Sequence, residues 1–380
     1  MSQIAVQRPL HNPELGAAPE TTTSPQVQRP AWLPSYIPEL QGLRGIAVLG
    51  VVIYHNHPLL TGTPFYYASL WGWAGVNLFF VLSGFLITSI LIEARDKPHY
   101  FRNFYARRAL RIWPVYILLL ILCYSIPDWF LGDKLANQTH WKTLVAYALF
   151  LQNLRHTPLP GTLGPTWSLA IEEQYYFLWA PIVRISKGRI GRWLLPILLL
   201  SLVVISPLIR FSHAHWLNPT HTLIHLDGIA MGSLLALGIY SLRFTRRTWL
   251  WIGVIASVAG IALAATYAGG TSFLDSALAL AFTGVVLLAI GGTGARNPLA
   301  LVFRRGPLAY YGQISYGMYM THILVFVYFG SFDARLDHMG ITGNLIILGL
   351  RIVVATVAAT ILWYGFESRI LKLKRYFMTK

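Results

Sequence analysis

The stretch LRGIAVLGVVIYH, residues 43–55, gives the clearest indication of the fold class. It is apolar enough to cross a bilayer, yet it carries Arg44 near its start and His55 at its end. On a helix that turns about 100° and rises about 1.5 Å per residue, these two side chains share one face and lie about 16 Å apart along the axis. Ionisable residues in membrane helices are costly and usually functional. The stretch therefore predicts a membrane helix with one polar group toward each membrane surface.

The composition of the whole chain also indicates a membrane protein. Of the 380 residues, 55% are hydrophobic and only 12% are charged, which is too little charge to cover a soluble domain of this size. Apolar runs of about 17–25 residues recur and are separated by short clusters of Arg and Lys. The predicted fold class is all-α, a polytopic membrane helix bundle. Ten transmembrane helices are expected at residues 42–60, 71–92, 111–128, 168–186, 192–211, 222–242, 248–267, 274–292, 307–329 and 343–366.

The distribution of basic residues sets this number of spans. An eleventh apolar run, residues 143–154, would place the basic loop 184–192 outside if it crossed the membrane. With ten spans, 24 of the 30 Lys and Arg residues face the cytoplasm, in agreement with the positive-inside rule. We therefore expect ten spans with both termini cytoplasmic, and residues 143–154 as a re-entrant or interfacial segment.

The sequence divides into three parts. Residues 1–37 begin with a stretch rich in Pro, Thr and Gln, which predicts a flexible cytoplasmic tail. Residues 38–370 would form the transmembrane domain, and residues 371–380 a basic cytoplasmic C-terminus. The net charge of +16 is distributed between apolar runs rather than on one soluble face, so it indicates membrane topology and no nucleic-acid partner.

Several ionisable residues fall inside the expected spans, where each is a candidate for function. Six of them would lie in one layer, roughly 7–12 Å below the outer surface at a rise of about 1.5 Å per residue. They are His55, Glu172, Glu173, Asp227, His322 and Arg351. This layer predicts a polar cavity that opens outward. A hydrated position at the membrane interface explains one or two such residues, and it is our interpretation of His57 and Arg210.

The chemistry of the layer centres on a histidine. A histidine can accept a proton near neutral pH, and a carboxylate can orient it, so His55 is the candidate base and Glu172 or Glu173 its partner. The two carboxylates lie about 100° apart on a helix, and the sequence leaves open which one faces His55. The chain has no G-x-S-x-G nucleophile elbow. Direct attack by a hydroxyl that His55 deprotonates is therefore the simpler chemistry.

Three arginines would meet near the cytoplasmic end of the bundle. Arg108 and Arg111 are spaced i, i+3 and share a helix face, and together with Arg44 they suit a ligand that carries phosphate. The positive-inside rule alone would also produce such a cluster. The spacing thus permits a phosphate-binding site without requiring one.

Four histidines near an expected outer loop have spacings that zinc sites use. They are His213, His215, His221 and His225. No Cys or carboxylate cluster accompanies them, so the sequence predicts no metal ion and no bound cofactor.

Five segments together resemble the acyltransferase-3 family of bacterial membrane O-acyltransferases, and the resemblance covers most of the chain. The segments are LQGLRGIAVLGVVIYH (40–55), GVNLFFVLSGFLIT (75–88), RRALRIWPVY (107–116), PTWSLAIEEQYYFLW (165–179) and ISYGMYMTH (314–322). The combination is specific, whereas each piece alone is not. Position 77 is Asn where many members of the family carry Asp, and the family's proline after the position of Glu367 is lacking.

The resemblance implies transfer of a short acyl group in the bacterial cytoplasmic (inner) membrane. Acyl-coenzyme A would be the cytoplasmic co-substrate, with its phosphates on the three arginines. His55 and one of the two adjacent glutamates would act on the acceptor hydroxyl. Asn77, Asp227, His322 and Arg351 would line the outer polar cavity, and Asn77 or Arg351 would stabilise the oxyanion.

Three functions remain open on the sequence alone. The first is acylation of an exported or membrane-linked carbohydrate or glycolipid, and the second is the same chemistry on a small secondary metabolite. The third is transport of an anionic solute, with the same buried charges as a pathway. A transporter would consume no thioester, and it would show paired Gly/Pro interruptions in two halves of the chain.

Overall fold

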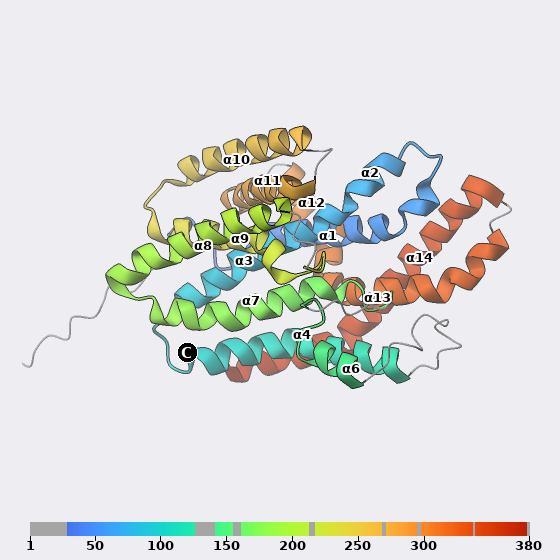
Figure 1. Cartoon of the computed structure of the whole chain (residues 1–380), viewed down its shortest axis with the longest axis horizontal. Helices are drawn as coiled ribbons and strands as arrows, with labels where there is room; N and C mark the ends of the chain where they lie inside the picture. The colour runs from blue at the N-terminus through green and yellow to red at the C-terminus, as the bar shows by residue number, and fades with distance from the viewer. Residues whose placement is uncertain are drawn as a thin grey trace, which may run out of the picture.

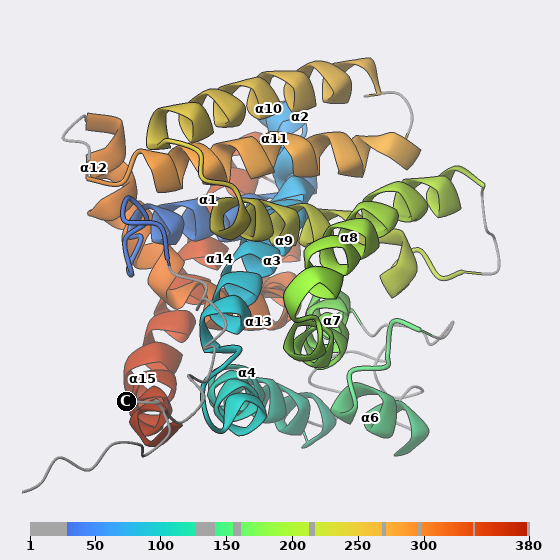
Figure 2. The ribbon, with the colours of Figure 1, turned by 90° about the vertical axis from the view of Figure 1, so that its left-hand side faces the viewer.

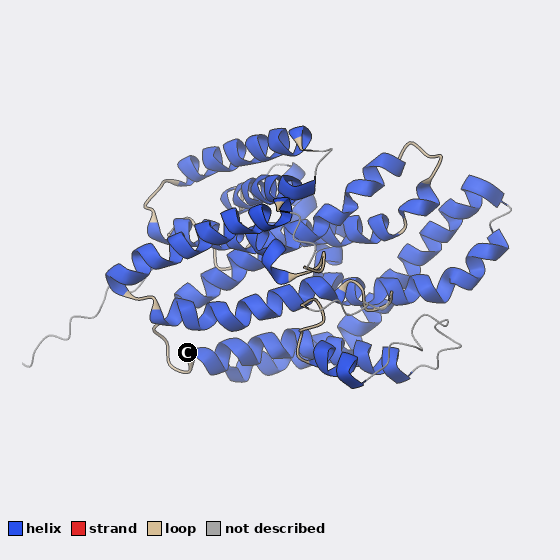
Figure 3. Cartoon of the chain, viewed as in Figure 1, coloured by secondary structure: helices blue, strands red, loops and turns tan. Residues whose placement is uncertain are grey.

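The computed structural model describes residues 29–125, 141–154, 161–212, 217–267, 271–294, 298–336 and 339–377. Within these ranges every regular element is helical, and there is no strand (Figure 3). The all-α prediction is therefore confirmed for the described part of the chain. His213 and His215 lie outside the described residues, as do residues 1–28 of the predicted tail.

Each of the ten predicted spans corresponds to one helix of at least 16 residues. These helices are α1 (Glu39–His55), α3 (Ala74–Ala94), α4 (Tyr100–Ser125), α7 (Thr166–Ile185), α8 (Gly188–Phe211), α9 (Leu226–Ser241), α10 (Arg246–Thr266), α11 (Thr271–Gly291), α13 (Pro307–Leu336) and α14 (Gly340–Leu362). By length and hydropathy alone, five segments of the described chain qualify as candidate membrane spans. They are Tyr66–Ala94, Gly191–Phe211, Arg246–Thr266, Ser272–Gly291 and Gly340–Phe377. The number of ten crossings stays a prediction.

Short helical elements connect or extend these helices. They are η1 (His57–Leu60), α2 (Tyr66–Leu70), η2 (Trp71–Trp73), α6 (Trp141–Ala148), η4 (Thr222–Ile224), α12 (Pro298–Arg304), the π-helical η6 (Trp363–Glu367), α15 (Ser368–Leu371) and η7 (Lys372–Phe377). Helix α6 has eight residues and is about 12 Å long, which is too short to cross a bilayer of about 30 Å. This length agrees with the re-entrant or interfacial interpretation of that run.

The long helices run along one another in a bundle (Figure 1). In Figure 2, α1, α3 and α9 occupy the middle of the molecule, with α10 and α11 along one edge and α4 with α6 along the opposite edge. Helices α3 and α9 approach closely because glycines face the partner backbone. A Cβ added at Gly84 would lie 2.0 Å from the carbonyl oxygen of Ile229, and one at Gly232 would lie 2.0 Å from that of Val81. Small residues at such contacts are typical of membrane helix packing.

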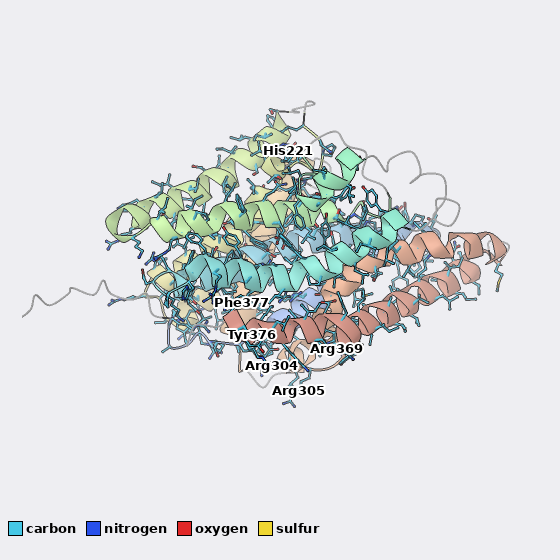
Figure 4. The ribbon with its side chains drawn as sticks, turned by 90° about the horizontal axis from the view of Figure 1, so that it is seen from below. His221, Arg304, Arg305, Arg369, Tyr376 and Phe377 are labelled. Carbon is cyan, nitrogen blue, oxygen red and sulfur yellow. The ribbon has the colours of Figure 1, made fainter. Side chains whose placement is uncertain are left out.

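Polar contacts join helix ends that the ten-span topology assigns to the cytoplasm. Lys187, before α8, donates to Asp96, after α3, at 2.5 Å, and this hydrogen bond lowers the pKa of the Asp96 carboxyl below its ordinary value. Arg304 of α12 pairs with Glu39 at the start of α1. In the view of Figure 4, Arg304 and Arg369 are on the opposite edge of the molecule from His221.

The predicted N-terminal tail, residues 1–37, includes residues that belong to the folded bundle. Leu33 is 5% exposed and packs into a hydrophobic cluster with helices α1, α3 and α9. The guanidinium of Arg29 donates to Glu93 at the end of α3 at 2.7 Å and to the carbonyl of Pro34 at 2.8 Å. Residues 29–37 are therefore part of the folded bundle, because an aliphatic side chain and an ion pair anchor a stretch whose composition suggested a tail.

The α3–α9 contact gives a direct test of packing. Gly84→Ala places a methyl group against the backbone of α9, so we expect it to lower the free energy of unfolding by about 1–3 kcal/mol. Gly349→Ala on α14 is the matched control, because no atom of a neighbouring element lies within 4 Å of the position that the added methyl group would take. Thermal unfolding of the detergent-solubilised protein measures both variants. Equal shifts in the two would contradict the close contact.

Candidate active site

An inner cavity of about 350 Å³ lies among helices α1, α3, α4, α7 and α13. Most of its wall is apolar, and its charged lining residues are Arg44, Arg108, Arg111 and Glu172. Their formal charges leave a net charge of +2 on the wall. The three arginines that the sequence assigned to one cluster therefore converge, and they come from two helices that are far apart in the chain.

Neighbouring side chains hold Arg44 and Arg108. Arg44 donates to the hydroxyl of Ser315 on α13 at 2.9 Å. Arg108 lies over the ring of Tyr176 at 4.1 Å from its centroid, and its Nη2 is 4.0 Å from Oε2 of Glu172. Arg111 lies on the same face of α4, one turn further along. Fixed guanidinium groups around an apolar cavity suit an anionic group that is attached to a longer ligand.

Glu172 belongs to this inner cluster and not to His55. Its Oε1 accepts from Ser83 at 2.9 Å and its Oε2 accepts from Tyr176 at 2.5 Å. The adjacent Glu173 also interacts electrostatically with Arg108. The predicted pairing of His55 with one of these glutamates is wrong, because both carboxylates turn toward the cations of α4.

The second, outer cavity has a volume of about 580 Å³. Its polar lining includes His55, Asn77, His225 and Asp275, and its aromatic lining includes Tyr54, Trp73, Trp167 and Tyr319. His55 is exposed to solvent at this position. A polar cavity with His55 on its wall was predicted from the sequence, but only Asn77 and His55 of the predicted set line it directly.

His322 of α13 takes the place expected for a carboxylate beside His55. Its Nε2 is 3.4 Å from Nδ1 of His55, and its own Nδ1 is 2.7 Å from the carbonyl of Tyr319. A carbonyl only accepts, so Nδ1 of His322 carries a proton and Nε2 is an acceptor. Nδ1 of His55 is also 2.9 Å from the carbonyl of Val51 and carries the proton there. This arrangement leaves Nε2 of His55 as the basic nitrogen.

The two cavities adjoin. Val76 of α3 and Tyr319 of α13 line both of them. The hydroxyl of Tyr319 lies 2.7 Å from that of Ser168 and donates to the carbonyl of Pro165 at 3.0 Å. A ligand longer than either cavity would pass Tyr319 on its way from the arginines to His55.

Two predicted outer-layer residues lie behind the cavity rather than on its wall. Asp227 accepts from Nη2 of Arg210 at 2.7 Å and from the hydroxyl of Ser276 at 2.5 Å. Arg351 donates to the side-chain oxygen of Asn56 at 2.8 Å and lies over the ring of Phe326. Arg351 is therefore not on the wall of either cavity, where an oxyanion would form.

The interpretation of Arg210 as an interfacial residue is wrong. Its side chain is 9% exposed, and besides Asp227 it donates to the carbonyls of Ser272 and Ile224. Sequence reasoning also missed Asp275, whose carboxylate lies 3.9 Å from Nε of Arg210. Asp275 is the second residue of an expected span, too close to its outer end to fall in the predicted layer, but a charge inside a span is itself the signal that could have found it.

Comparison with known proteins agrees with the resemblance seen in the motifs. A family profile described as an acyltransferase domain matches residues 37–365. The chain belongs to the acyltransferase-3 family. The match includes every residue on the walls of the two cavities except Ser35 and Tyr36. Membership in this family, together with the five candidate spans, makes the chain a multi-pass membrane protein.

Named relatives of this acyltransferase-3 member are O-acetyltransferases. The peptidoglycan O-acetyltransferase OatA of Listeria monocytogenes is 28% identical over 317 residues, which cover 76% of this chain and 49% of OatA. A provisionally named O-acetyltransferase of Staphylococcus aureus (strain COL) is 31% identical over 224 residues, which cover 53% of this chain and 34% of that protein. The chain thus spans less than half the length of these relatives. No solved structure matches the chain.

Breaking the buried ion pair between Arg210 and Asp227 tests the charge arrangement behind the outer cavity. Arg210→Met leaves the carboxylate of Asp227 buried without its cation, so we expect a loss of about 3–5 kcal/mol in the free energy of unfolding. The double variant Arg210→Met/Asp227→Asn removes the unpaired charge and should recover part of this loss. Arg247→Met, at an exposed position, is the control. Thermal unfolding in detergent measures all three, and an Arg210→Met variant as stable as the control would refute the pairing.

Proposed function

We propose that this protein is a membrane O-acyltransferase that moves a short acyl group from cytoplasmic acyl-coenzyme A to a hydroxyl of a cell-envelope carbohydrate. The observation that carries the proposal is the meeting of two unlike cavities at Val76 and Tyr319. One has a cationic wall, and the other has a solvent-exposed histidine with a free basic nitrogen. The bilayer to which we assign it is the bacterial cytoplasmic membrane.

The inner cavity suits the donor. Coenzyme A has an anionic nucleotide end and a long, uncharged pantetheine arm. The phosphates would bind Arg44 and Arg111, whose charges are not matched by a carboxylate in the cavity wall, while Glu172 balances Arg108. The arm would follow the apolar wall toward Tyr319, which brings the thioester to the junction with the outer cavity.

The outer cavity suits the acceptor and the proton transfer. Nε2 of His55 takes the proton of the acceptor hydroxyl as the oxygen attacks the thioester carbonyl. The tetrahedral intermediate collapses, the carbon–sulfur bond breaks, and the new ester remains on the acceptor. The protonated His55 returns the proton to the departing thiolate, so the products are an ester and free coenzyme A. His322 and the carbonyl of Val51 hold the ring of His55 in the required tautomer.

A carbohydrate acceptor is favoured by the relatives. OatA is named as a peptidoglycan O-acetyltransferase, and peptidoglycan is a carbohydrate polymer outside the membrane. A hydroxyl on such a polymer would reach the outer cavity without crossing the bilayer. A small secondary metabolite is the alternative acceptor for the same chemistry.

We also propose ten crossings with both termini in the cytoplasm. Two sets of ion pairs support this topology, because each joins helix ends that it assigns to the cytoplasmic side. Asp96, after α3, pairs with Arg184 of α7 and Lys187 before α8, and Glu39 of α1 pairs with Arg304 of α12. On the opposite side, His55, Asn77 and Asp275 come from the outer ends of three helices and line one cavity. These three ends meet on one side because successive crossings alternate in direction.

The role of His55 is tested by thiol release. His55→Ala removes the base, and we expect the rate of thiol release from acetyl-coenzyme A in the presence of solubilised peptidoglycan fragments to fall about 10²–10⁴-fold. Donor affinity should be retained, because His55 lies outside the inner cavity.

His57→Ala is the matched control for this experiment. His57 is two residues away, its Nδ1 is 2.7 Å from the carbonyl of Tyr54, and it lines neither cavity. Its rate should stay within about threefold of wild type. A wild-type protein that does not bind acetyl-coenzyme A would overturn the donor assignment and favour a transporter.

The cationic wall is tested by comparing two donors. Arg111→Gln removes a phosphate partner, so the Kd for acetyl-coenzyme A should rise about tenfold or more. Acetyl-pantetheine has no phosphate, and its Kd should be unchanged. Arg247→Gln, on the same predicted side, is the control. Equal effects of Arg111→Gln on the two donors, measured by calorimetry, would remove Arg111 from phosphate recognition.

A further inference from the structure

The outer cavity contains a carboxylate that the proposed chemistry does not use. Asp275 of α11 lines this cavity, and its side chain is only 15% exposed. Its Oδ1 accepts a hydrogen bond from the amide of Asn77 at 3.2 Å. Its Oδ2 is 3.9 Å from Nε of Arg210 and 4.0 Å from Nδ1 of His225. Both distances exceed hydrogen-bond length, so Oδ2 has room to accept from a ligand.

The charges around Asp275 leave this part of the cavity negative. Arg210 is already committed to Asp227, to Ser276 and to two backbone carbonyls. Arg210, Asp227 and Asp275 together carry a net charge of −1. Only Asp275 of the three lines the cavity. An anionic ligand would therefore meet repulsion here, whereas a hydroxyl could donate to the carboxylate.

Aromatic rings form the rest of the wall around this carboxylate. Trp167 and Trp73 both line the cavity. The Trp167 ring packs on His225 at 4.8 Å between centroids and on Phe80 at 6.0 Å, which fixes its orientation. Because His225 contacts both Trp167 and Asp275, the indole lines the same part of the cavity as the carboxylate and the amide of Asn77. This part of the wall therefore combines an aromatic surface with hydrogen-bonding groups. The carbon–hydrogen face of a pyranose and the hydroxyls at its edge have this same pattern.

We propose that Asp275, Asn77 and Trp167 form the acceptor subsite, and that it binds an uncharged pyranose ring and rejects anionic sugars. The ring stacks on Trp167, and one of its hydroxyls donates to Oδ2 of Asp275. Another hydroxyl of the same ring then faces Nε2 of His55 across the cavity. This inference rests on the proposed acyl transfer, and it adds the charge and the ring type of the acceptor.

The test compares two oligosaccharides as acceptors for the full-length protein in detergent. The probes are the tetramer of N-acetylglucosamine, which is uncharged, and tetragalacturonic acid, which is anionic. We expect kcat/KM for acetyl transfer to favour the uncharged probe about tenfold or more in wild type. Asp275→Asn keeps the shape and the contact with Asn77 but removes the charge, and it should reduce this ratio about tenfold. The ratio does not depend on the fraction of protein that folds.

A second variant tests the stacking surface. Trp167→Ala should raise the KM for the uncharged tetramer about tenfold, because it removes the stacking plane. Trp251→Ala, at an exposed position on α10, is the control and should leave this KM unchanged. Asp96→Asn, in the loop after α3, is the control for the loss of a carboxylate.

The outcomes separate this inference from the proposed function. A wild type that uses both tetramers equally, or uses neither while it still binds acetyl-coenzyme A, overturns the acceptor subsite and leaves the donor site standing. An unchanged ratio in Asp275→Asn overturns it as well. A wild type that does not bind acetyl-coenzyme A overturns the proposed function itself.

Discussion

A charge inside a helix bundle must be paired or hydrated, and this constraint determines which ionisable groups of the protein stay accessible to ligands. Asp227 and Arg210 satisfy one another, with Ser276 as a third partner, and both are buried behind the cavity wall. His55 and Asp275 instead face an open volume. Of these four groups, only His55 and Asp275 are therefore placed to contact a substrate.

The same constraint separates the two cavities by charge. The inner wall carries three arginines against Glu172, and the outer wall carries Asp275 without a cation at hydrogen-bond distance. An anionic nucleotide and an uncharged sugar would then bind in different cavities that share Val76 and Tyr319. Tyr319 lines both cavities, so the reacting groups would meet beside it, between the positively charged wall of the inner cavity and the negatively charged wall of the outer cavity.

Much of this arrangement could be predicted from the sequence, and the misassigned glutamates show a physical limit of such predictions. Apolar runs located the ten long helices, and the i, i+3 spacing of Arg108 and Arg111 located the inner cluster. Depth along a helix is a one-dimensional quantity, and it correctly placed His55 and His322 at one level. It gives no direction around the helix, so the sequence leaves both Glu172 and Glu173 as possible partners of His55, although Glu172 faces α3 and α4. Only tertiary packing fixes that rotation.

The replacement of a carboxylate by His322 changes what the site can do. A carboxylate beside His55 would stabilise the imidazolium and make it a poorer acid toward the leaving thiolate. A neutral imidazole with its acceptor nitrogen toward Nδ1 of His55 fixes the tautomer without adding negative charge. In the proposed reaction, His322 would thus fix the tautomer of His55 and leave its Nε2 to take the proton of the acceptor and return it to the thiolate. The site would achieve by a neutral ring the orientation that a carboxylate gives in other histidine-dependent enzymes.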